Sequence, residues 1–218
     1  MLLRRTFLGL AAALALPRAW AQGDGLALLG QFLQQVRSGR AQFTQAVTSP
    51  PRAGQPPRVR PSSGTLEFQR PGRFRFVYRK PFEQTLVADG QTLWLHDVDL
   101  NQVTARKQAQ ALGGTPLALI LSATDLAGLQ AAFELKAEPA REGLSWVRAT
   151  PKNREGQFQY ALVGLRAGDK GPELAALEVL DSLGQRSVLT FSGFEVNAAV
   201  RAETFQFQVP AGADLIRS

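Results

Sequence analysis

Apolar and polar residues alternate along short segments through most of this chain. The clearest case lies between residues 73 and 79, where Phe74, Phe76 and Tyr78 alternate with arginines. Successive side chains of a β-strand point to opposite faces, so this alternation predicts strands with one apolar face. Many short strands at such spacing indicate an antiparallel sheet that curls or closes. The predicted strands cover residues 41–47, 65–69, 73–79, 84–88, 92–96, 102–107, 131–137, 144–149, 157–166, 174–181, 187–195 and 204–209.

Helical periodicity appears in two segments. Between a possible N-cap at Asp24 and a possible end at Gly39, the spacing i, i+3, i+4, i+7 is filled by Leu29, Phe32, Leu33 and Val36. The second segment begins with the possible N-cap Thr115 and with Pro116, and it is apolar nearly all round as far as Leu121. A helix of this kind is normally buried on both sides, so we expect it inside or across the sheet.

Turn and loop signals separate these elements. The pair Asp89-Gly90 predicts a tight hairpin, and the Ser-Leu-Gly segment at 182–184 predicts a second turn. The prolines between residues 49 and 63 predict one irregular loop. No domain boundary or internal repeat is evident, and we predict that residues 22–218 form one domain.

The N-terminus has the features of a cleavable export signal. Arg4 and Arg5 precede an apolar run over residues 7–16, and the segment 19–21 is a small-x-small cleavage site. We therefore predict that residues 1–21 are a signal peptide and that the mature protein is periplasmic. The two arginines also resemble a twin-arginine signal, so the general and the twin-arginine export routes both remain open.

Composition narrows the class of protein further. The apolar run is too short to span a bilayer, and no later segment approaches the roughly 20 consecutive apolar residues that a membrane helix needs. The chain contains no cysteine, so the exported domain is expected to fold without disulfides and to carry no lipid anchor on an N-terminal cysteine.

Basic residues concentrate in one part of the chain. Residues 52–80 contain eight lysines and arginines against the single acidic residue Glu67. A basic face attracts acidic partners or anionic lipid headgroups, and a sheet face kept soluble by charge is the alternative interpretation. Nucleic acid is not expected as a partner, because the protein is expected to leave the cytoplasm. Arginines on the strands and prolines in the loops discourage edge pairing, so we expect a monomer.

The sequence offers few candidates for catalysis. His96 is the only histidine, and with Asp97 and Asp99 it forms only a weak pattern of metal ligands in an expected hairpin loop. A serine or threonine nucleophile would have to use His96 as its base, and nothing marks such a residue out. No glycine-rich phosphate loop is present. We therefore predict no metal, no cofactor and no enzyme activity.

Several short motifs occur in a definite order. They are Phe43-Thr44-Gln45, Arg70-Pro71-x-x-Phe74, Val87-x-Asp89-Gly90-x-Thr92-Leu93-Trp94, Gly114-Thr115-Pro116 before an apolar helix, and Phe205-x-Phe207-x-x-Pro210. The pattern resembles the LolA family of periplasmic outer-membrane lipoprotein carriers and extends over essentially all of residues 22–218. The resemblance implies a mainly β fold, an incomplete and strongly curved antiparallel β-barrel of about 10–11 strands with short lid helices over an apolar cavity.

The resemblance also implies a function and a set of site residues. The cavity would take the acyl chains of lipoproteins released by an inner-membrane ABC transporter, and the carrier would deliver them to a LolB-like receptor lipoprotein at the outer membrane. Arg70 would hydrogen-bond to the lid in the closed state. The lid residues would be Leu117, Leu119 and Ile120, and the cavity residues would be Leu29, Phe32, Leu33, Phe74, Phe76, Trp94 and Leu121.

Two other functions remain open from the sequence. The first is a periplasmic half-barrel module that binds or senses another amphiphile. The second is a small periplasmic hydrolase. The longer proline-rich loop at 49–63 departs from the family pattern.

Overall fold

The computed structural model describes residues 25–51, 54–111, 116–153 and 158–217. In this part of the chain twelve strands form one sheet, in the order β12-β6-β5-β4-β3-β2-β1-β11-β10-β9-β8-β7. Neighbouring strands are antiparallel except for the parallel pair of β12 and β6. The strands are β1 (Ser38–Thr48), β2 (Val59–Gln69), β3 (Arg73–Lys80), β4 (Gln84–Ala88), β5 (Thr92–Asp97), β6 (Gln102–Lys107), β7 (Phe133–Arg141), β8 (Leu144–Pro151), β9 (Phe158–Gly168), β10 (Gly171–Asp181), β11 (Arg186–Val196) and β12 (Asp214–Arg217).

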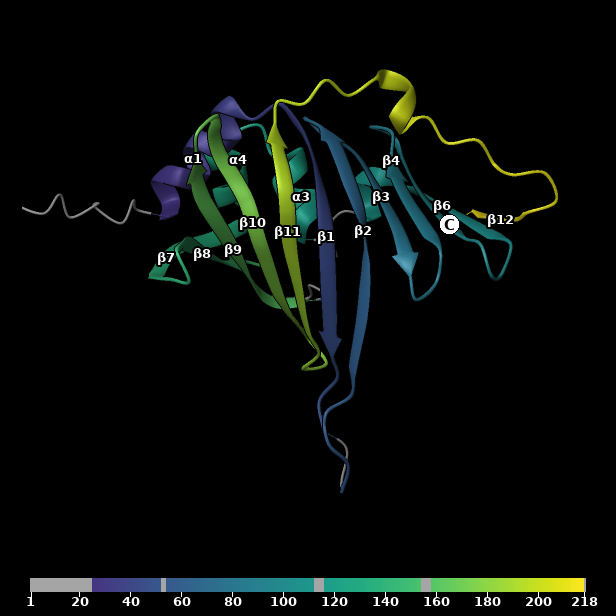
Figure 1. Cartoon of the computed structure of the whole chain (residues 1–218), viewed down its shortest axis with the longest axis horizontal. Coiled ribbons are helices and arrows are strands. Elements are labelled where there is room, and N and C mark those ends of the chain that lie inside the picture. The colour runs from purple at the N-terminus through teal and green to yellow at the C-terminus, as the bar shows by residue number, and fades with distance from the viewer. Residues whose placement is uncertain (1–24, 52–53, 112–115, 154–157, 218) are drawn as a thin grey trace, which may run out of the picture.

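The sheet is strongly curved (Figure 1). It does not close into a barrel, since β12 and β7 lie at its two ends and do not pair with each other. The helices gather on one face, which we call the inner face. They are α1 (Gly25–Gln35), α2 (Gln108–Ala111), α3 (Pro116–Ser122) and α4 (Leu126–Ala132), and a 3₁₀ turn, η2 (Ala202–Phe205), follows the last long strand. The predicted mainly β, incomplete half-barrel with short helices is therefore confirmed.

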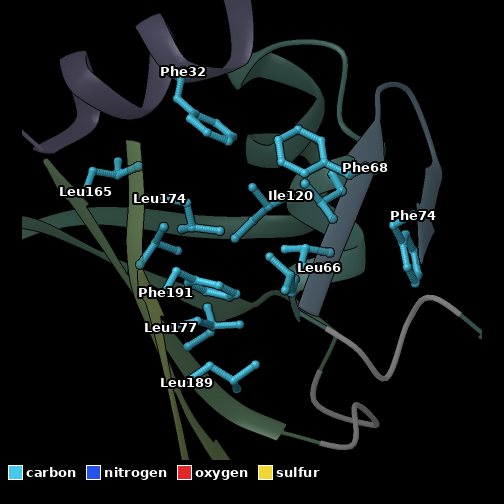
Figure 2. Packing of buried hydrophobic residues seen from close by; sticks show 14 of the residues in the cluster. Phe32, Leu66, Phe68, Phe74, Ile120, Leu165, Leu174, Leu177, Leu189 and Phe191 are labelled. Carbon is cyan, nitrogen blue, oxygen red and sulfur yellow. The ribbon is translucent and has the colours of Figure 1, made fainter. Parts of the chain in front are cut away.

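Cross-strand pairing explains why the alternating residues produce one apolar face. Phe68 lies opposite Phe74, and Leu66 lies opposite Phe76, so the alternation of β3 continues across β2. Phe43 on β1 contacts the edge of the Phe76 ring at a centroid distance of 5.4 Å. Figure 2 shows buried side chains from α1, α3 and the long strands pointing toward one another. The core therefore fills the space between the inner face of the sheet and the helices.

Two glycines allow close approach on this face. A Cβ on Gly64 would lie 1.9 Å from the Val77 carbonyl oxygen, at the point where the register between β2 and β3 shifts. A Cβ on Gly39 would lie 2.7 Å from the Phe68 ring. Gly39 was expected to end the first helix, but α1 ends at Gln35 and Gly39 belongs to β1. Its missing side chain makes room for a core ring.

The predicted loop at 49–63 is wrong at its end, because residues 59–63 belong to β2. Pro61 lies opposite Ala46 of β1, whereas pairing between β2 and β3 begins only at Ser63. At Pro61 the strand therefore has one neighbour, and proline is tolerated at such an edge because its nitrogen has no proton to donate.

Two further strand predictions need correction. Residues 131–132 end α4, a helix that the periodicity did not indicate, and Asp125 caps it by accepting a hydrogen bond from the Gly128 backbone at 2.8 Å. Residues 204–209 form the end of η2 and irregular chain instead of a strand. Residues 214–217 form β12 and pair with β6, so they, and not residues 204–209, extend the sheet beside β6.

Candidate functional site

Eight of the predicted site residues meet in one buried cluster on the inner face. α1 and α3 approach it from the helix side, and β3 forms part of its floor (Figure 2). No member of the group exposes more than 5% of its surface. The eight are Leu29, Phe32, Leu33, Phe74, Phe76, Leu117, Ile120 and Leu121. Leu119 lies on α3, but its side chain is outside the described part of the structure.

Trp94 lies elsewhere, which corrects its assignment to the cavity. Its neighbour Leu93 packs against the inner cluster, so Trp94 points to the outer face of β5. There its ring stacks on Phe207 at 5.4 Å, and its Nε1 donates to Asp89 Oδ2 at 2.9 Å. The motifs that contain Trp94 and Phe207 thus hold the C-terminal segment against the outer face.

Apolar side chains pack closely in the interior that the described residues form. A cavity of about 20 Å³ remains between the helices and the sheet, which is room for roughly one water molecule. Its lining is entirely apolar and comprises Leu29, Ile120, Leu129, Phe133, Leu135, Ala149, Phe158, Ala161 and Val163. An extended apolar ligand can enter only if the helices move away from the sheet.

Arg70 connects the ends of two of these helices. Its Nη1 donates to the carbonyl oxygens of Leu33 at 2.6 Å and Val36 at 3.1 Å, at the C-terminal end of α1. Its Nη2 donates to the carbonyl oxygen of Ala123, immediately after α3. We call this set of hydrogen bonds the Arg70 bridge.

The chemistry of the bridge follows from helix ends. The last carbonyl groups of a helix have no partner within the helix, and a guanidinium group can donate to several of them at once. Arg70 is only 6% exposed. Burial, and to a lesser degree the nearby charge of Arg37, lowers the pKa of Arg70 to about 10. The side chain is therefore still charged at neutral pH.

The turn that carries Arg70 makes further contacts. The Gly72 backbone donates to the Leu121 carbonyl oxygen at 3.1 Å, which adds a second tie to α3. Gln108, which is 5% exposed, donates from Nε2 to the Gly72 carbonyl oxygen at 2.7 Å. Its Oε1 accepts from the Gly90 backbone at 3.0 Å. Gln108 thus holds the Arg70 turn against the β4–β5 turn.

Sequence reasoning missed Gln108, because a single glutamine after a strand carries no periodic signal. It also expected the other arginines of β3 to face water. Arg75 does lie on the outer face, but its Nη1 donates to the Thr204 carbonyl oxygen at 3.3 Å. That contact attaches η2 to the outer face, where Phe205 is buried.

The described residues offer little for other chemistry. Among them, no group of three or more histidine, cysteine or acidic side chains is arranged to hold a metal ion. No helix in the described part of the chain is long and apolar enough to cross a membrane.

Known proteins provide an independent comparison. Residues 34–208 match the profile of the family described as outer membrane lipoprotein carrier protein LolA. The chain is 62% identical over 197 residues to the outer-membrane lipoprotein carrier protein of Albidiferax ferrireducens, across 90% of this chain and 92% of that one. It is 51% identical over 205 residues to the protein of the same name from Methylibium petroleiphilum, across 94% and 95% of the two chains.

A solved structure supports the fold alone. A DUF1329 family protein from Desulfovibrio piger has a TM-score of 0.52 and 11% sequence identity, across 84% of this chain and 95% of that chain. The family profile and the two relatives together extend over most of the sequence. The chain therefore belongs to the LolA family of outer membrane lipoprotein carriers.

Proposed function

We propose that the protein carries lipoproteins through the periplasm by enclosing their acyl chains between the helices and the inner face of the sheet. The observation that carries this proposal is a wholly apolar interior whose covering helices are joined by a single buried arginine. The names of its relatives agree with it. In this proposal Leu117, Leu119 and Ile120 belong to the lid, and Arg70 fastens it.

The energetics explain why such a carrier needs a lid. Burial of an acyl chain stabilises the complex by about 0.8 kcal/mol per methylene group, so several long chains could contribute tens of kcal/mol. A carrier that realised all of this energy would not release its cargo. Separating α1 and α3 from the sheet exposes their own apolar side chains and breaks the Arg70 bridge. Both costs lower the net affinity for cargo.

The same proposal assigns partners and a location. An inner-membrane ABC transporter supplies the cargo and the energy for loading, and a LolB-like receptor lipoprotein at the outer membrane accepts it. Residues 1–21 serve as the export signal, and residues 22–218 act as one monomeric domain. The protein performs no catalysis and uses no cofactor. Sedimentation equilibrium at micromolar concentration checks the monomer, and a stable dimer would contradict it.

Copurification tests the proposed cargo. The protein is isolated from a periplasmic extract, and its bound molecules are identified by mass spectrometry. We expect triacylated lipoproteins, and we expect the same lipoproteins without their acyl chains not to bind the purified protein. Recovery of another amphiphile in their place would favour a half-barrel module of different specificity. Equal binding of acylated and deacylated forms would refute the enclosure of acyl chains.

A further inference from the structure

Four basic side chains gather at the end of β2 and β3 that lies away from α1. They are Arg58, Arg60, Arg79 and Lys80, all exposed, and none forms an ion pair with another described residue. By contrast, Arg70 and Arg75 of the same basic stretch are held by backbone carbonyl groups. The four cations of this end therefore take no part in the Arg70 bridge or in the contact that attaches η2 to the outer face.

Exposed apolar side chains lie among these cations. Val59 is 55% exposed, Phe82 is 64% exposed and Leu183 is 83% exposed. Val59 begins β2, Phe82 lies in the β3–β4 connection and Leu183 lies in the β10–β11 turn. Apolar side chains that are exposed together on one part of a surface mark sites that bind a protein or a membrane.

Some of these residues line one cleft, and the others lie beside its walls in the sequence. A cleft of about 390 Å³ is lined by Arg60, Lys80, Phe82 and, from the β10–β11 turn, Gln185. A Cβ on Gly184 would lie 4.0 Å from Pro50, which places that turn beside the end of β1. In Figure 1, β1 and β2 run to the lower end of the view beside the β10–β11 turn. We call Arg58, Val59, Arg60, Arg79, Lys80, Phe82 and Leu183 the basic tip.

The cleft at the basic tip leads toward the apolar interior. Tyr78 lines it, and the same ring contacts Phe43 of the core at a centroid distance of 5.0 Å. Acidic side chains also lie nearby: Glu83 follows Phe82, and the Val98 backbone donates to the Glu83 carbonyl oxygen, which brings Asp97 and Asp99 close. These carboxylates lie on the side of β4 and β5, whereas three of the four cations belong to β2 and β3, and Arg58 directly precedes β2.

We propose that the basic tip docks the protein onto a bilayer surface that contains anionic phospholipids. The cations would approach the phosphate groups, and Phe82, Val59 and Leu183 would enter the headgroup layer, the arrangement by which peripheral proteins bind such surfaces. A lipid surface fits better than an acidic protein, because the apolar side chains stand on three separate segments of a projecting end and can insert independently. Docking at this end would bring the interior next to the membrane.

Vesicle cosedimentation with the cargo-free mature protein tests the proposal. We expect binding to phosphatidylcholine vesicles that contain phosphatidylglycerol, little binding to phosphatidylcholine alone, and release at high salt. Because each cation near the surface contributes about a fivefold increase in partitioning, Lys80→Glu should weaken binding roughly 25-fold. Phe82→Ser should weaken it about tenfold, whereas Glu83→Gln should strengthen it.

Two matched variants away from the basic tip serve as controls. Arg106→Glu reverses an exposed charge, and Ile216→Ser removes an apolar side chain that is 42% exposed. Both should bind vesicles like the unchanged protein. Equal binding to the two kinds of vesicle, or equal losses in tip and control variants, would overturn the proposal, as would binding only to acidic proteins. The assay contains no lipoprotein, so its failure would leave the proposed cargo function to its own test.

Discussion

Replacement of Arg70 by leucine is the most direct test of the Arg70 bridge. Leucine removes the guanidinium group and leaves the carbonyl groups of Leu33, Val36 and Ala123 without their donor. A hydrogen bond to a charged group contributes about 1.5–3 kcal/mol, so the three bonds together contribute about 5 kcal/mol at the lower end of that range. Burial of the charge opposes this gain, since the fall of the Arg70 pKa from 12.5 to about 10 corresponds to roughly 3 kcal/mol. A net contribution of about 2 kcal/mol to the closed state remains, or roughly a 30-fold change in the ratio of closed to open molecules.

The expected result is a protein that opens more readily. In a fluorescence titration, Arg70→Leu should bind an environment-sensitive hydrophobic dye more strongly, and it should also retain lipoprotein more tightly. Transfer of that lipoprotein to the receptor should fail, because closure no longer helps to expel the acyl chains. Arg70→Lys should lie between the two proteins, since an ammonium group reaches fewer carbonyl groups than the guanidinium fork does.

Arg73→Leu is the control, because Arg73 alternates with Phe74 and points to the outer face of the same strand. It should change neither dye binding nor transfer. If Arg70→Leu and Arg73→Leu behave alike in both assays, the reasoning about the bridge is wrong, and Arg70 is only one more member of the basic stretch.

Three further predictions follow from single residues. Ile120→Asp places a charge in an apolar interior. It should lower the free energy of unfolding by at least about 3 kcal/mol and abolish lipoprotein uptake. Unchanged thermal denaturation and unchanged uptake would exclude a buried α3. Gln108→Ala removes the hydrogen bonds from Gln108 to Gly72 and Gly90. It should lower the free energy of unfolding by about 1–3 kcal/mol and raise dye binding. A loss of stability without any change in dye binding would limit Gln108 to a structural role. Burial alone would raise the pKa of Glu178, but hydrogen bonds from Arg186 and Arg141 outweigh it and keep the pKa below its ordinary value of 4.5. The stabilisation by the Glu178 carboxylate is thus complete above pH 4.5 and is lost as the pH falls through the folded-state pKa. Glu178→Gln should therefore be less stable than the unchanged protein by about 1–3 kcal/mol at pH 7 and equally stable in strong acid. Chemical denaturation at each pH checks both expectations.

Alternation along the chain was enough to determine the local β structure. The pattern at Phe74, Phe76 and Tyr78 depends only on the opposite directions of neighbouring side chains, and it correctly placed β3 and most other strands. The same argument identified the face of β3 that enters the core. Spacing likewise found α1 and α3, because each buries a stripe of apolar residues.

Long-range pairing decided what alternation could not. An aromatic residue on a strand can be buried on either face, and only the C-terminal segment lying across the outer face explains why Trp94 stacks on Phe207. Residues 204–209 have a strand-like pattern, yet the edge of β6 pairs with β12 instead of with them. Pro61 could enter a strand only because β3 does not extend beside it.

The Arg70 bridge separates the two sources of information most clearly. From the sequence, Arg70 is one arginine among eight basic residues, and only the family resemblance suggested a special position. Its hydrogen bonds join segments more than thirty residues apart, to Leu33 in one direction and to Ala123 in the other. Gln108 likewise joins two turns that no local pattern connects. Local periodicity determines which side chains are buried, whereas the unpaired carbonyl groups that a buried cation meets are brought together only by the tertiary structure.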